Sequence, residues 1–131
     1  MVVRVVQLGS QRSEGEGLRI GTVRRPPRGV PKSEFASGNW YDLWYPNLAP
    51  SVETMKLGQA ALSGDDAAGW TAFVRRYRQE MAQPEAARSI ALLAALSHSA
   101  DFSVGCYCAD EARCHRGLLR GLLAEQGAAL G

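Results

Sequence analysis

The sequence lacks any long apolar run and any large excess of charge of one sign. Its 131 residues include 15 Lys and Arg against 13 Asp and Glu, so the formal net charge is only +2. No segment approaches the roughly 20 consecutive apolar residues that a membrane-spanning helix needs. A net charge this small does not by itself indicate a nucleic-acid-binding protein. Composition therefore excludes a membrane-spanning class and gives a polyanion partner no support.

Cysteine is also scarce. The chain has three cysteines, and all of them lie between Cys106 and Cys114. An odd number in so short a stretch excludes a disulfide framework that would hold a whole domain together. The segment Met1–Val6 lacks the charged start and the cleavage site that are typical of a secretory signal peptide. We therefore expect a cytoplasmic protein whose thiols are free, bind a metal or take part in redox chemistry.

Hydrophobic patterning predicts an order of strand, strand, long loop, three helices, strand and helix. The strands are expected at residues 2–8, 18–24 and 102–108. The helices are expected at residues 51–62, around the apolar stripe from Trp70 to Met81, from Pro84 to Leu96, and at 115–126. The polar loop of residues 9–17 is shorter than most parallel crossovers, so the first two strands either pair antiparallel or use a degenerate crossover.

This pattern predicts a single α/β domain over residues 1–131. We expect a small, short-stranded sheet covered by about four helices in a Rossmann-like three-layer arrangement. Hydrophobic content of 46% and charged content of 21% are ordinary for a soluble globular protein. A chain of this length buries roughly two-thirds of its surface, so it needs neither a disulfide nor a metal in order to fold.

The long segment Arg28–Pro50 is predicted to be irregular because it contains two glycines and three prolines. They are Gly29, Pro31, Gly38, Pro46 and Pro50. Loops of this length in a small domain are usually functional or mobile. Aromatic residues in it indicate that it packs on the body of the protein. They are Trp40, Tyr41, Trp44 and Tyr45.

The segment from Cys106 to Arg116 is the strongest candidate for a functional site. Cys106 and Cys108 share one face of the predicted strand, and Cys114 falls at the start of the next helix, before His115 and Arg116. A helix start favours anions, and ligands of open α/β sheets bind beyond the carboxyl ends of the strands. Both rules indicate the same loop.

Three chemistries are open for this segment. The first is anion binding by helix N–H groups with His115 and with Arg116 or Arg113. The second is thiol chemistry, with Cys114 as a nucleophile activated at the helix start. The third is zinc binding by Cys106, Cys108, Cys114 and His115.

Cys106 and Cys108 also suit plain core positions, and the adjacency of Cys114 and His115 makes shared ligation awkward. We therefore predict no metal and no cofactor, with Cys114 and His115 as the catalytic candidates.

A basic turn from Arg24 to Lys32 is the second informative stretch. Its prolines and Gly29 display the cations on a stiff loop, and arginine offers a planar fork for phosphate or carboxylate. We predict ligand-binding roles for Arg24, Arg28 and Lys32, together with Arg116. The alternative is a solvated charge run with no binding role.

Several of these segments resemble a known family. The residues that carry the resemblance are Arg19 to Gly29, Lys32, Asp42-x-Trp44-x5-Pro50-Ser51 and Phe73-x3-Tyr77. They resemble the YeaO-like branch of the bacterial family of domain of unknown function 488. The later Cys-x5-Cys-His-Arg, which ends at Arg116, is similar to the wider family.

The resemblance implies a cytoplasmic α/β protein with Arg24, Arg28 and His115 at the family's recurring polar positions. It implies no assigned reaction. Val23 stands where the YeaO-like pattern has an acidic residue, and Pro26 stands where it has a tryptophan. A mechanism that needs that carboxylate is therefore not expected here.

Three functions follow, in order of preference. The first is the binding of an anionic small molecule between the basic turn and the Cys-His-Arg helix start, with enzymatic activity left open. The second is a nucleic-acid or protein interaction module that uses the basic and aromatic loop. The third is a metal-binding or redox-sensing protein built on the cysteines. The sequence predicts no membrane partner and leaves the oligomeric state open.

Overall fold

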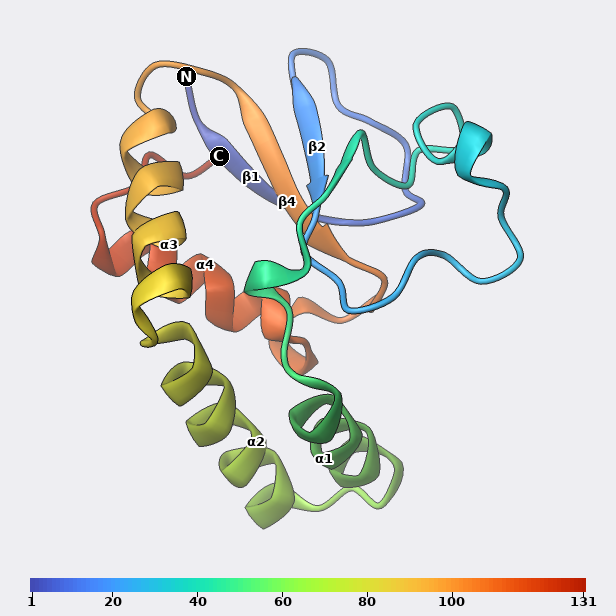
Figure 1. Ribbon diagram of the computed structural model, residues 1–131, viewed down its shortest axis with the longest axis vertical. Coiled ribbons are helices and arrows are strands. Elements are labelled where there is room, and N and C mark those ends of the chain that lie inside the picture. Colours follow the sequence, from blue (N-terminus) through green and yellow to red (C-terminus); the bar gives the residue numbers. More distant parts are fainter.

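A four-stranded, entirely parallel sheet organises the computed structural model, which describes residues 1–131. The strands are β1 (Val3–Gln7), β2 (Leu18–Gly21), β3 (Leu43–Trp44) and β4 (Phe102–Cys106). Their order across the sheet is β1-β4-β2-β3 (Figure 1). β4 lies between β1 and β2 and pairs with both, so the predicted alternative of an antiparallel β1–β2 pair is wrong.

Four helices accompany the sheet. They are α1 (Val52–Ser63), α2 (Ala67–Met81), α3 (Pro84–Leu96) and α4 (His115–Glu125). The Ser51 hydroxyl caps α1 by accepting the Thr54 N–H, and Pro84 occupies the first turn of α3. α1 and α2 form a hairpin beyond the carboxyl ends of the strands, while α3 and α4 lie beside the strands (Figure 1). None of the four combines the length and the apolar character needed to cross a membrane.

The main core lies between one face of the sheet and helices α2, α3 and α4. Val5 of β1, Ile20 of β2 and Val104 of β4 point to this face, as the two-residue period of strands requires. Tyr77 of α2 is fully buried among them, and its hydroxyl donates to the Leu48 carbonyl at 2.8 Å. Helices packed on a short sheet confirm the predicted α/β class.

The opposite face of the sheet buries an ion pair. The Arg19 guanidinium donates to both carboxylate oxygens of Glu16, at 2.7 and 2.9 Å, and the Ser103 hydroxyl donates to the same carboxylate at 2.8 Å. Arg19 also donates to the carbonyls of Ser10 and Asn39. Neither charged residue has more than 2% of its surface exposed. This network joins the sheet to the irregular segments that cover it.

β3 lies inside the segment that the sequence predicts to be irregular. Leu43 and Trp44 pair in parallel with Ile20 and Gly21. Two residues are too few to produce an alternating pattern, so the sequence carries no signal for this strand.

The two ends of the chain meet at the outer edge of the sheet. The Val3 N–H donates to the Ala129 carbonyl at 2.8 Å, and the Gly131 N–H donates to the Val3 carbonyl at 2.9 Å. Val3 and Leu130 form a parallel bridge. Residues 129–131 therefore lie along β1 on the side away from β4 (Figure 1).

The buried pair predicts a large effect of a small substitution. We expect Glu16→Gln to lower the free energy of unfolding by about 3 kcal/mol or more, because the buried Arg19 guanidinium loses its counter-charge. Urea denaturation measures the change. Glu14→Gln, an exposed position in the same loop, is the matched control and is expected to change stability by less than about 0.5 kcal/mol. Equal stability of the two variants would contradict the prediction.

The same pair predicts how stability depends on pH. Burial raises the pKa of the Glu16 carboxyl, but hydrogen bonds from Arg19 and Ser103 more than offset this and lower the pKa from 4.5 to about 2. A carboxyl with a depressed folded-state pKa stabilises the fold above its unfolded pKa and loses that effect as the pH falls towards the folded value.

We therefore expect the stability difference between wild type and Glu16→Gln to be full at neutral pH and to shrink between about pH 4.5 and about pH 2. Urea denaturation at each pH measures it. A difference that stays constant over this range would mean that the charge on Glu16 is not what stabilises the fold.

Candidate functional site

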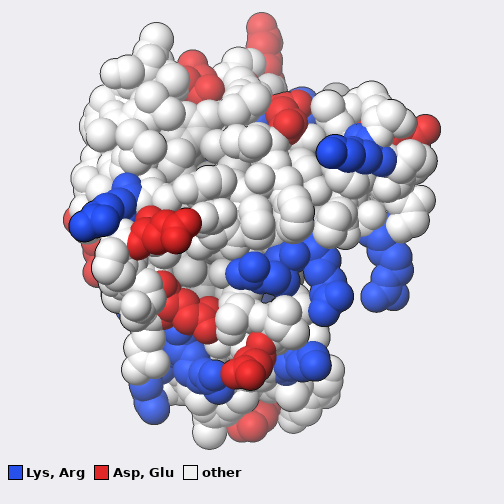
Figure 2. Space-filling model, viewed as in Figure 1, with Lys and Arg blue, Asp and Glu red and all other residues white.

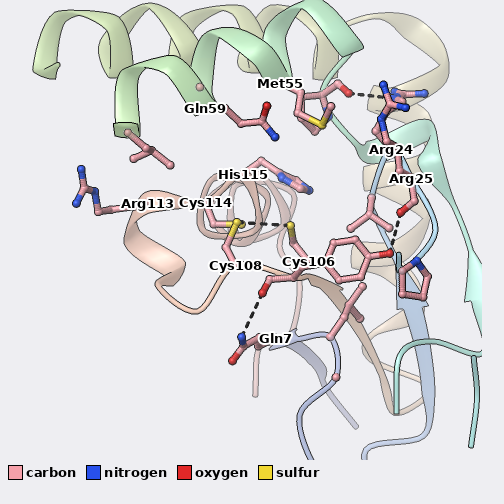
Figure 3. A pocket seen from close by; sticks show the side chains of 18 of the residues that line it. Gln7, Arg24, Arg25, Met55, Gln59, Cys106, Cys108, Arg113, Cys114 and His115 are labelled. Carbon is pink, nitrogen blue, oxygen red and sulfur yellow. Dashed lines mark hydrogen bonds between the residues drawn. The ribbon is translucent and has the colours of Figure 1, made fainter. Parts of the chain in front are cut away.

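A cleft of about 1000 Å³ opens at the carboxyl ends of β1, β2 and β4. Because these strands are parallel, their carboxyl ends meet at one edge of the sheet, where open α/β sheets usually bind ligands. Gln7 ends β1 on this side, and α1 forms the facing wall with Met55 and Gln59 (Figure 3). The site therefore lies between the sheet edge and the first helix.

The cysteines and His115 gather on the floor of this cleft (Figure 3). Cys106 ends β4, Cys114 is the extended residue before α4, and His115 is the first residue of α4. The sulfurs of Cys106 and Cys108 are 3.8 Å apart. One sulfur each from Cys106 and Cys114 and a ring nitrogen of His115 all lie within 4.8 Å of one another. The predicted strand end and helix start thus meet in one cluster.

The three thiols differ in how readily they ionise. Hydrogen bonds from Cys106 and Cys114, with the nearby His115 and Arg116, lower the pKa of the half-buried Cys108 thiol. Donating to Cys108 raises the pKa of Cys106 to about 11, and its sulfur neighbours and burial raise the pKa of Cys114. Cys108, rather than the predicted Cys114, is the thiol whose surroundings favour the thiolate.

His115 is held as a neutral imidazole in one tautomer. Its Nε2 lies 2.7 Å from the Thr22 carbonyl, which can only accept, so Nε2 carries the proton. Burial lowers the pKa of His115, and the bond to Thr22 offsets this only in part. Nδ1 therefore keeps a lone pair, which can accept a proton or bind a metal.

Positive charge dominates the rim of the cleft. Its lining contains no Asp or Glu side chain, and it contains five cationic residues. They are Arg24, Arg25, Arg28, Lys56 and Arg113. Lys and Arg side chains gather over the segment that follows β2 (Figure 2). The predicted basic turn and the predicted Cys-His helix start therefore face one cavity, which suits an anion.

The arginines of the basic turn are not equivalent. The Arg24 guanidinium donates to three backbone carbonyls between Pro46 and Pro50, at 3.0 to 3.3 Å, and so holds the chain that leads into α1. Arg25 and Arg28 are exposed, and their guanidinium groups make no hydrogen bond or ion pair within the chain. Arg24, which the sequence predicts to bind an anion, therefore chiefly stabilises the backbone before α1. The guanidinium groups of Arg25 and Arg28 are free to bind a ligand.

Two predicted ligand-binding residues lie outside the cleft lining. Arg116 is 5% exposed, and its Nη2 donates to the carbonyls of Cys108 and Ala109 at 3.1 and 3.2 Å. Arg116 therefore holds the loop after β4. Lys32 is exposed at the start of a single 3-10 turn, Lys32–Glu34, and is not among the residues that line the cavity.

Sequence reasoning missed the contribution of α1. Lys56 and Gln59 lie three residues apart on this helix, and both line the cleft. Such spacing puts them on one face, which is the only signal that the sequence offers. Nothing in the sequence states that this face points to the sheet edge.

The aromatic residues of the long segment make contacts in different parts of the structure. Trp40 lines the cleft and packs edge-on against Tyr107, with ring centroids 5.9 Å apart. Tyr41 is buried, and the Tyr45 hydroxyl is 2.6 Å from the Ser89 hydroxyl. Trp44 is 43% exposed, and its ring N–H donates to the Val23 carbonyl at 2.8 Å. The interaction-module alternative stays a prediction.

The different roles of the adjacent residues Arg24 and Arg25 can be tested by comparing the stability of their alanine variants. We expect Arg24→Ala to lower the free energy of unfolding by about 2 kcal/mol, because three partly buried carbonyls lose a charged donor. Arg25→Ala is expected to change it by less than about 0.5 kcal/mol, since its guanidinium contacts solvent. Urea denaturation of both variants measures the difference, and equal losses would contradict these assignments.

Comparison with known proteins identifies the family to which this chain is similar. No curated protein and no solved structure matches the sequence. The family model DUF488-N3a, described as the active DUF488-N3 subclade, matches residues 3–127. The match spans all four strands and all four helices, and it confirms the resemblance to the family of domain of unknown function 488, while the YeaO-like branch stays a prediction. The chain therefore belongs to the DUF488 family.

Proposed function

We propose that this protein binds a small anionic molecule, bearing phosphate or carboxylate, in the cleft between the sheet edge and α1. The observation that carries the proposal is the charge of the lining, which has five cationic residues and no acidic one. Low-dielectric walls focus such a field and raise the local concentration of anions. Arg25 and Arg28, together with Lys56, are the cations with the most freedom to meet a ligand, whereas Arg113 already contacts Asp65 at 3.5 Å.

The size and the apolar walls of the cleft support a ligand larger than a free ion. Its volume of about 1000 Å³ is at the upper end for small-molecule sites. Trp40, Trp70 and Phe73 contribute aromatic surface, and Val23 and Pro27 contribute apolar surface. A molecule with an anionic group at the basic rim and an apolar or ring-shaped body would match both parts.

Isothermal titration calorimetry with pyrophosphate and with citrate tests the proposal. We expect wild type to bind at least one of the two, and the double variant Arg25→Ala/Arg28→Ala to bind it about tenfold or more weakly, because each charged hydrogen bond lost costs more than about 1.5 kcal/mol. Neither side chain braces the fold, so the variant is expected to keep its stability.

The matched control is Arg75→Ala/Arg88→Ala, which removes the same charge from exposed helix positions outside the cleft. We expect this control to bind like wild type. Equal weakening in both double variants would mean that net charge, rather than the cleft, attracts the anion. No heat with either probe in wild type would also overturn the proposal.

A further inference from the structure

We propose that the floor of the cleft is a soft-metal site that takes one Zn²⁺-like ion. Cys106, Cys114 and His115 form its core, and Cys108 supplies the fourth ligand. Thiolate and imidazole are the ligand types that zinc prefers, usually four in tetrahedral geometry. The proposal goes beyond anion binding and does not depend on it, because it rests on the floor and not on the cationic rim.

The spacing of the sulfurs supports the site. Two sulfurs bound to one tetrahedral ion at about 2.3 Å each lie about 3.8 Å apart. The sulfurs of Cys106 and Cys108 are 3.8 Å apart. One ligand atom each from Cys106, Cys114 and His115 lies within 4.8 Å of the others, a set that does not include Cys108. Metal binding therefore requires these atoms to draw together by up to about 1 Å, with Cys108 following its contact to Cys106 as the fourth ligand.

The adjacency of Cys114 and His115 does not keep their ligand atoms apart. Cys114 is extended, with φ −145° and ψ 150°, whereas His115 is the first helical residue of α4. This change of backbone conformation lets two successive side chains reach the same space, and their atoms converge with Cys106. The adjacency of Cys114 and His115 in the sequence therefore does not prevent both residues from binding the same ion.

His115 already has the outer contact of a metal ligand. Histidines that bind metals generally donate their other ring N–H to a carboxylate, a carbonyl or water, which fixes the tautomer. Here Nε2 donates to the Thr22 carbonyl at 2.7 Å. Because that carbonyl belongs to the backbone just after β2, the ring is anchored by the sheet and presents Nδ1 as the ligand atom.

Charge is balanced next to the site. Three thiolates and a divalent cation carry a net charge of −1, and the three thiol protons leave to solvent. Arg116 is 95% buried, lies beside Cys108 through its bond to that carbonyl, and has a buried Nε without a partner. Its carboxylate partner is Glu111, at 3.4 Å. A neighbouring anionic centre would give this buried cation a second partner.

Cobalt titration of the purified, reduced full-length chain tests the proposal. We expect one Co²⁺ per chain, with thiolate-to-cobalt charge-transfer absorption and the visible bands of tetrahedral Co²⁺, and displacement by Zn²⁺. Cys114→Ser and His115→Gln are expected to weaken binding by more than about 100-fold, beyond the cost of an outer-shell change. Cys108→Ser is expected to reduce the charge-transfer intensity.

Two controls separate the site from other causes. His98→Gln removes the other histidine of the chain, which is exposed, and is expected to bind Co²⁺ like wild type. Arg25→Ala/Arg28→Ala is also expected to bind Co²⁺ unchanged, so failure of the metal site and failure of anion binding are distinguishable. Absent bands in wild type, or equal bands in Cys114→Ser, would overturn the proposal.

A measurement on wild type alone avoids any folding defect of the variants. We expect saturating Zn²⁺ to protect Cys108, the half-buried thiol with the lowered pKa, from iodoacetamide, as read by mass spectrometry. Unchanged alkylation in Zn²⁺ would overturn the site. Recovery of a Cys106–Cys108 disulfide from protein that binds no metal would also overturn it, and would assign the cluster to thiol–disulfide chemistry instead.

Discussion

Parallel pairing on both sides of β4 is the constraint on which the rest of the structure depends. β4 comes late in the chain, yet it lies between the first two strands, with Val104 opposite both Val5 and Ile20. Because all three strands run the same way, their carboxyl ends bring residues from the beginning and the end of the chain to one edge. This pairing brings together the cluster of cysteines and His115. Cys106 ends β4, and Thr22, whose carbonyl holds His115, follows β2.

The buried Glu16–Arg19 pair secures the same arrangement from the other face. It links the loop before β2 to Ser103 of β4 and, through the Asn39 carbonyl, to the long segment. A buried ion pair gives specificity only when its hydrogen bonds are completed, as they are here. One face of the sheet is thus held by helices and apolar packing, and the other by this polar network together with Tyr41, which packs over Gly21.

Local pattern predicted the elements well and their assembly poorly. The Trp70–Met81 stripe, the Ser51 cap and the Pro84 helix start all appear in the helices, because each is a short-range signal. The order β1-β4-β2-β3 depends on contacts between distant segments, which no local pattern encodes. The place of the site could be predicted from a strand end and a helix start. The stabilising role of Arg24 could not be predicted, because it depends on backbone carbonyls more than twenty residues away in the sequence.

The meeting of the chain ends has a consequence for association. β1 is an outer strand, and an outer strand normally offers free N–H and C=O groups to the strand of another molecule. Residues 129–131 already take up both backbone groups of Val3. The tail thus blocks the start of that edge as a template for strand addition, and self-association through β1 would first require this tail to peel away.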